Sequence, residues 1–150
     1  MRRKLIVLAV LLMATVASAT DFTVMVGKDY IFSDVSLSRM GLFQVGIAAA
    51  IDYTIESENI SDDFEMDFGS HYVGPIVKLH VLPEDDDWAL YASYSALFEN
   101  VDIDDDVYEI LGATLTYKNW GISYQYYLSE YKMEPDPDND RLMLTWTGHF

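Results

Sequence analysis

From residue 20 onward, apolar and polar residues alternate along much of the chain with a period of two, which is the pattern of β-strands. The clearest run extends over thirteen residues from Phe43 to Ile55, with every large apolar side chain at an odd position. A strand in a soluble protein is typically ~5–6 residues long. A tilted membrane strand needs ~9–11 residues and often extends beyond the membrane. The length of this run therefore favours a membrane strand.

Seven further runs alternate in the same way and predict strands, although the second is the least regular. They cover residues 22–26, 31–38, 72–81, 88–98, 110–117, 122–129 and 141–150. Proline cannot donate a backbone hydrogen bond, so Pro75 predicts a β-bulge or an irregularity near the outer rim within its run. Eight strands are an even number, as single-chain barrels of bacterial outer membranes require.

The connections between the runs alternate between short and long. Short turns fall at residues 38–41, 83–87 and 118–119, and acidic loops fall at residues 57–69, 99–106 and 133–140. Outer-membrane barrels have short periplasmic turns and longer outer loops. The sequence therefore predicts an all-β, eight-stranded antiparallel transmembrane up-and-down β-barrel. In this arrangement only the first outer connection, near Gly27–Asp29, is short.

The start of the chain indicates export. Residues 2–4 are basic, residues 5–16 are uncharged and mostly apolar, and residues 17–19 are small, which is the pattern of a secretory signal peptide. The apolar run is too short to span a membrane, which takes ~20 residues. We therefore assign residues 1–19 to a signal peptide and residues 20–150 to the barrel.

The last run ends the chain on an aromatic residue, Phe150. It resembles the closing strand of bacterial outer-membrane β-barrels, which commonly ends in such a residue. That resemblance implies the outer membrane as the location and the barrel-assembly machinery as a partner that recognises this strand.

The amino-acid composition limits the classes of molecule that this protein could bind and the ways in which it could be stabilised. The sequence has nine Lys and Arg against 25 Asp and Glu; removing the three basic residues at 2–4 leaves six, so the net charge becomes −19. Such a charge argues against a nucleic-acid partner, which requires a basic surface. The sequence has no Cys, so an exported chain has to be stabilised without disulfides.

The two faces of the predicted strands differ in chemistry. Aromatic residues on the apolar face should form girdles at the membrane boundaries. The residues expected at the periplasmic girdle are Phe43, Trp88, Tyr117, Trp120 and Phe150, and those expected at the outer end are Tyr53, Phe98 and Tyr131. The inward face is mainly small and weakly polar.

Charged and polar residues on the inward face need partners there, because a buried charge must be paired. We expect a polar network in the lumen that includes Asp52, Lys78, His80 and Arg141, and therefore no open water-filled channel. A gated path for small solutes is an alternative, as is a soluble β-sandwich or lipocalin-like periplasmic binding protein in which the apolar face is the core.

The sequence predicts neither catalytic residues nor a cofactor. Small outer-membrane barrels include lipid A deacylases and palmitoyltransferases, so a lipid-modifying enzyme is an alternative. Ser70 and His71 are adjacent and should point to opposite faces of a strand, so they do not form a ready catalytic dyad. No His-x-Ser pair on one strand face, as the deacylases would show, is present.

Two acidic segments resemble the opening of a calcium-binding loop. They contribute the candidate ligands Asp102, Asp104, Asp106, Asp136, Asp138 and Asp140. Both segments lack the glycine and the glutamate of an EF-hand. The alternatives are solvated loops, weak divalent-ion binding, and a cation bridge to lipopolysaccharide phosphates.

The chain from residue 20 onward resembles the small eight-stranded outer-membrane proteins of the OmpA and OmpX class. Its layout is most similar to the YfaZ family, with a short first hairpin and the rhythm of residues 88–94, 110–117 and 121–127. The resemblance implies a monomer in contact with outer-membrane lipid and lipopolysaccharide. It also implies a structural or surface-interaction role through the acidic outer loops, and it carries no catalytic residues.

Overall fold

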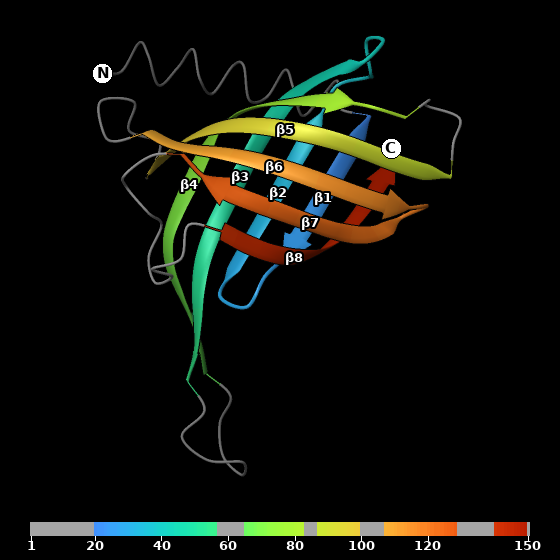
Figure 1. The fold of residues 1–150 in the computed structure, drawn as a ribbon. Helices are drawn as coiled ribbons and strands as arrows, with labels where there is room; N and C mark the ends of the chain where they lie inside the picture. The colour runs from blue at the N-terminus through green and yellow to red at the C-terminus, as the bar shows by residue number, and fades with distance from the viewer. Residues whose placement is uncertain (1–19, 57–64, 83–86, 100–106, 129–139, 150) are drawn as a thin grey trace.

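The computed structural model describes residues 20–56, 65–82, 87–99, 107–128 and 140–149, and these residues contain eight strands. The strands are β1 (Asp21–Val26), β2 (Tyr30–Ser36), β3 (Phe43–Glu56), β4 (Glu65–His80), β5 (Trp88–Glu99), β6 (Val107–Tyr117), β7 (Trp120–Tyr127) and β8 (Asp140–His149). Each strand pairs antiparallel with the next, and β8 pairs with β1, so the sheet closes (Figure 1). The predicted all-β, eight-stranded, up-and-down antiparallel barrel is confirmed.

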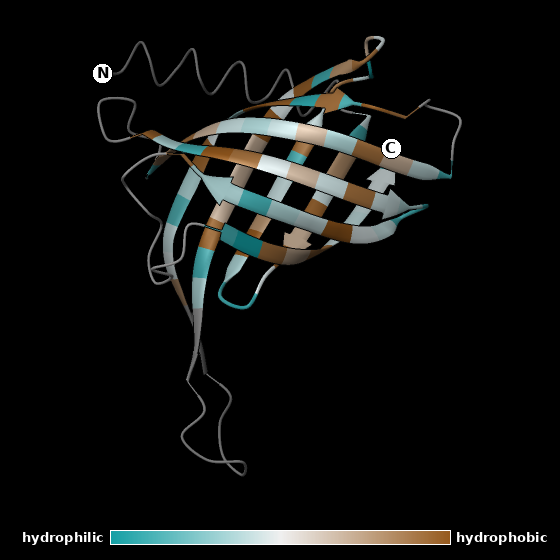
Figure 2. Cartoon of the chain, viewed as in Figure 1, coloured by the Kyte–Doolittle hydropathy of each residue, from teal (hydrophilic) through white to brown (hydrophobic). Residues whose placement is uncertain are grey.

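Every strand turns one face into the barrel and the other away from it. In β7, for example, Ser123, Gln125 and Tyr127 are buried, whereas Ile122 and Tyr124 are exposed. Hydrophilic and hydrophobic residues alternate along the strands in Figure 2. The period of two in the sequence therefore assigned most side chains to the correct face.

The interior is more apolar than the sequence suggested. The inward face does carry small and polar residues, but a cluster of large side chains fills the space between them. This cluster consists of Met25, Tyr30, Phe32, Ala48, Ala50, Tyr72, Ile76, Leu97, Tyr108, Ile110, Tyr127 and Met143. An eight-stranded barrel is just wide enough for side chains to fill.

The hairpin of β3 and β4 is longer than predicted. The expected loop at residues 57–69 is wrong for residues 65–69, because β4 begins at Glu65, opposite Glu56 of β3. β2 pairs with β3 only as far as Asp52, and β4 pairs with β5 only from Tyr72. The hairpin therefore extends as two strands beyond the rest of the barrel (Figure 1). An acidic segment can pair in this way because a two-stranded extension needs no apolar face.

The pairing of β3 with β4 shifts register between Ile51 and Tyr53. Asp52 and Tyr53 follow one another and are both buried, with Tyr53 only 7% exposed. The Tyr53 hydroxyl donates a hydrogen bond of 2.6 Å to the carbonyl oxygen of Gly27. The prediction that Tyr53 belongs to an outward girdle is therefore wrong, because a bulge inverts the period of two.

Of the two alternatives predicted at Pro75, the β-bulge is wrong, whereas an irregularity is present as a gap in the pairing of β4 with β5. Pro75 pairs with Ile47 of β3, and the register between β4 and β5 is the same on both sides of Pro75. The ladder with β5 simply omits Gly74 and Pro75. A Cβ atom on Gly74 would lie 1.8 Å from the carbonyl oxygen of Ala96, so the two backbones approach each other closely here.

The turn between β2 and β3 depends on Gly41. Met40 and Phe43 close this turn with two backbone hydrogen bonds, and Gly41 between them has a φ of 64°. We expect Gly41→Ala to lower the free energy of unfolding by ~1–2 kcal/mol, because a Cβ atom disfavours this left-handed conformation. No atom lies within 4 Å of the added Cβ position, so the cost comes from the backbone alone.

Urea unfolding of the two variants Gly41→Ala and Gly41→Asn tests this expectation. Asparagine tolerates positive φ better than alanine, so Gly41→Asn should be the milder change. Equal losses from both substitutions would contradict the explanation.

Candidate functional site

The four residues predicted to form a lumen network all lie on the inward face. Asp52, Lys78 and Arg141 are 4%, 2% and 6% exposed, and His80 is half-buried at the end of β4. The structure divides them between two clusters instead of one. Lys78 and His80 lie near the end of the barrel that carries the turns after β2, β4 and β6, which we call the short-turn end. Asp52 and Arg141 lie nearer to the other end.

The first cluster is organised around Lys78 of β4. Its ammonium Nζ donates to a carboxylate oxygen of Asp34 on β2, at 2.5 Å, and to Oγ1 of Thr23 on β1, at 3.2 Å. It also lies 5.1 Å from the ring centroid of Tyr91 on β5, and Ser36 donates to the same Asp34 oxygen at 2.8 Å. A charge this deeply buried requires such a partner. Asp34 is the residue that the sequence analysis missed, since only the register of β2 against β4 brings it to Lys78.

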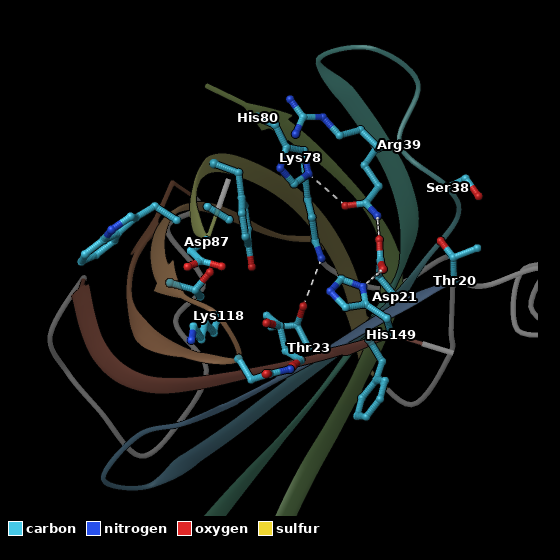
Figure 3. Close-up of a pocket in the computed structure, with 18 residues that line it drawn as sticks. Thr20, Asp21, Thr23, Ser38, Arg39, Lys78, His80, Asp87, Lys118 and His149 are labelled. Atoms are coloured by element: carbon cyan, nitrogen blue, oxygen red, sulfur yellow. Dashed lines mark hydrogen bonds and ion pairs between the residues drawn. The ribbon is translucent and has the colours of Figure 1, made fainter. Parts of the chain in front are cut away.

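A chain of hydrogen bonds crosses the short-turn end beside this cluster. His149 of β8 bonds to the carboxylate of Asp21, which accepts a second bond from the side-chain amide of Gln44. The amide oxygen of Gln44 lies 2.9 Å from Nε2 of His80. Four strands are linked in this way, and the bonds are drawn in Figure 3.

The second cluster is organised around Arg141 of β8. Its guanidinium lies 3.8 Å from the Asp52 carboxylate and 4.3 Å and 5.3 Å from the ring centroids of Tyr30 and Tyr127. The Tyr72 hydroxyl donates to the other Asp52 oxygen at 3.2 Å. The three tyrosines come from β2, β4 and β7, so they hold the ion pair from three sides. The sequence placed Tyr72 and Tyr127 on the inward face, but it gave no sign that they meet this ion pair.

We expect Tyr72→Phe to lower the free energy of unfolding by ~1–2 kcal/mol, because a hydrogen bond to a charged, buried group is lost. The matched control is Tyr94→Phe, in which an exposed hydroxyl loses its bond to Glu109. The control should change stability by less than ~0.5 kcal/mol. Chemical denaturation of both variants measures the difference, and equal losses would contradict a role for Tyr72 in holding Asp52.

A cavity of about 580 Å³ lies above the first cluster, at the short-turn end. Its wall comes from six strands, β1, β3, β4, β5, β6 and β8, and from turns at this end of the barrel. The lining residues are Thr20, Asp21, Phe22, Thr23, Ser38, Arg39, Gln44, Lys78, His80, Asp87, Trp88, Ala89, Tyr91, Thr116, Lys118, Asn119, Thr147 and His149. Figure 3 shows Lys78 reaching into it from the wall. The sequence analysis named only Lys78, His80 and the girdle residue Trp88 from this set.

The outward face presents large apolar and aromatic residues to the surroundings. Phe43, Trp88, Tyr117 and Trp120, predicted as one girdle, are between 46% and 60% exposed and lie at the short-turn end. The rings of Trp88 and Tyr117 pack 4.9 Å apart. Phe150 and Tyr131 lie outside the described residues.

Charge on the outward face is confined to one end in the part of the chain whose side chains are described. Glu109 of β6 and Asp140 of β8 lie at the end from which the long connections leave. They accept hydrogen bonds from the hydroxyls of Tyr94 and Tyr124. Asp140 was predicted to belong to a loop, but it begins β8, because the ladder to β7 reaches Tyr126.

The remaining candidate calcium ligands, Asp102, Asp104, Asp106, Asp136 and Asp138, lie outside the described residues. Among the residues that the structure does describe, no group of three or more His, Asp or Glu side chains could hold a metal ion. No helix within the same residues is long and apolar enough to cross a membrane.

Comparison with known proteins gave no match to a protein-family model, to a curated protein or to a solved structure. The inference of function therefore depends on the geometry of the barrel and on its chemistry.

Proposed function

We propose that this protein is a small outer-membrane β-barrel whose role is structural or one of surface interaction, through acidic loops at the cell exterior, and that it has no open pore. Its partners in this proposal are membrane lipid and lipopolysaccharide around the barrel and the assembly machinery at the closing strand. A monomer suffices, because each strand of the closed wall has a neighbour on both sides.

The observation that carries the proposal is that large apolar side chains are exposed on the outside of the barrel, whereas charged side chains are buried inside it. Large apolar side chains such as Leu111, Leu115, Ile122, Leu142 and Leu144 are between 38% and 68% exposed. Ion pairs, by contrast, are buried in the interior. Soluble proteins rarely expose contiguous apolar patches of more than a few hundred Å². A barrel with an apolar outside and a polar network inside fits a lipid environment.

The height of the uncharged band agrees with this environment. Tyr117 and Glu109 are the lower aromatic and the upper charged residue of β6, eight positions apart. At ~3.3 Å per residue and a strand tilt of ~40°, they are separated by ~20 Å along the barrel axis. The apolar band of an outer-membrane barrel is ~25 Å tall.

The filled interior supports a barrel without a pore. Tyr30, Phe32, Ile110 and Met143 are each at most 2% exposed, and they belong to the cluster of large side chains that fills the interior. We therefore expect no stable conductance in planar bilayers. Discrete, reproducible channel events from the purified protein would support the alternative of a narrow transport barrel.

Gel electrophoresis tests the proposal directly. The mobility of the protein from the outer-membrane fraction is compared in SDS samples before and after boiling. We expect a heat-dependent shift in the outer-membrane fraction, because a closed barrel leaves no edge strand from which unravelling could begin. Recovery of the protein in a detergent-free periplasmic extract would contradict the membrane location, and the outward apolar residues would then need a different explanation.

A further inference from the structure

The cavity at the short-turn end is lined by half of the Lys and Arg residues that follow residue 19 in this acidic protein. Beyond residues 1–19 the sequence has six Lys and Arg, and three of them, Arg39, Lys78 and Lys118, line this cavity. Two of the three His residues, His80 and His149, line it too. Among the described residues, the carboxylates in its lining are those of Asp21 and Asp87.

The pairing of these charges leaves two cations without a carboxylate partner among the described residues, and one of them, the Lys118 ammonium, lies 5.4 Å from the ring centroid of Tyr117. Lys78 is engaged by Asp34 below the cavity, and Asp21 is engaged by His149 and Gln44. Arg39 and Lys118, by contrast, form no ion pair with any carboxylate in the described part of the chain.

Arg39 is also held in a fixed position. Its Nε donates to the carbonyl oxygen of Gly41 at 2.6 Å, and its Nη2 donates to that of Leu82 at 2.8 Å. The guanidinium therefore joins the β2–β3 turn to the end of β4. A charged group held in place in this way loses little entropy when it binds a ligand.

The rest of the wall is suited to a hydroxylated ligand. Hydroxyl and amide side chains occupy much of it, including Thr20, Ser38, Gln44 and Asn119, and the Asp87 carboxylate adds a strong acceptor. The ring of Tyr91 supplies an apolar surface. The volume of about 580 Å³ lies within the range of ~300–1,000 Å³ that is typical of small-molecule sites.

We propose that this cavity binds a small hydroxylated organic anion, such as a sugar phosphate or a sugar acid. The anionic group lies against Arg39, and the hydroxyls of the ligand donate to Asp87 and bond to Lys118 and the neighbouring polar side chains on the opposite wall, where Figure 3 shows both residues. This inference depends on the closed barrel and on the cavity at its short-turn end. It does not depend on the proposed membrane location.

An NMR titration tests the proposal. Each ligand is added to the isotopically labelled full-length protein in zwitterionic micelles, and the chemical shifts of the backbone amides are followed. The probes are glucose 6-phosphate and gluconate, with glucose as the uncharged control. We expect saturable shifts, confined to residues 38–44, 87–91 and 116–119, for one or both anions and much smaller shifts for glucose. The two anions distinguish a preference for phosphate from a preference for carboxylate.

Variants identify the residues that bind. Lys118 lies in an exposed turn, so its replacement should not disturb the fold, and we expect Lys118→Gln to weaken binding about tenfold. We expect Arg39→Gln to weaken binding at least as much. The matched control is Lys28→Gln, which removes the same charge at the opposite end of the barrel and should leave the affinity unchanged. The proposal is overturned by the absence of saturable shifts, by an equal response to glucose, or by an equal loss of affinity in Lys28→Gln and Lys118→Gln.

Discussion

An arginine in place of Ala113 should lower the free energy of unfolding by ~2–4 kcal/mol if the barrel is embedded in a bilayer. Ala113 faces outward on β6, between Ala92 of β5 and Tyr124 of β7, and lies midway between Tyr117 and Glu109. Its side chain is small, so the substitution removes no packing and adds a charge at mid-depth. Unfolding by urea from phospholipid vesicles measures the loss.

The same substitution separates the membrane location from the soluble alternative. On a surface exposed to water, Ala113→Arg should change stability by no more than ~0.5 kcal/mol. Ala113→Leu is the matched control, because it enlarges the side chain without charge and should be neutral or stabilising in lipid. A small effect of Ala113→Arg in vesicles would contradict the proposed orientation of the apolar face.

Removal of one member of the Lys78–Asp34 pair should lower the free energy of unfolding by ~3–5 kcal/mol, because it leaves an uncompensated buried charge. Lys78→Met leaves Asp34 with a single neutral donor, the Ser36 hydroxyl. Asp34→Asn leaves the ammonium of Lys78 with the hydroxyl of Thr23 and the ring of Tyr91. Each of these changes leaves the other member of the pair, which is at most 3% exposed, without its ionic partner.

A double-mutant cycle measures the interaction within this pair. The double variant Lys78→Met/Asp34→Asn should be more stable than the sum of the single losses implies, with a coupling of ~2 kcal/mol or more. Lys28→Met removes an exposed lysine at the other end of the barrel and should cost less than ~0.5 kcal/mol. Additive single losses would mean that the two charges do not depend on one another.

The alternation of side chains was a reliable guide wherever the strand remained regular. The run from Phe43 to Ile51 and the run over 120–127 were assigned to the correct faces, because adjacent residues in a pleated strand must point in opposite directions. The assignment failed at Tyr53, where a single bulged position turned the side chain inward. A bulge leaves no mark in hydrophobic periodicity, so this error could not have been avoided from the sequence.

The sequence also identified the inward charges without identifying their partners. Asp52, Lys78, His80 and Arg141 stand at inward positions of their runs, and the cost of burying a charge made a polar network predictable. Their partners are far away along the chain, as with Asp34, which lies 44 positions before Lys78. Only the register of the strands brings such residues together, and the pattern of one strand does not contain that register.

The sequence by itself determined that the chain forms eight antiparallel strands with one apolar and one mixed face, because the period of two and the spacing of the turns are local properties. Only the tertiary structure decided that the inward charges separate into two clusters and that a cavity lined by Arg39, Lys78 and Lys118 opens at the short-turn end. These features depend on closure of the sheet. Closure brings β1 against β8 and turns residues from distant strands toward one axis.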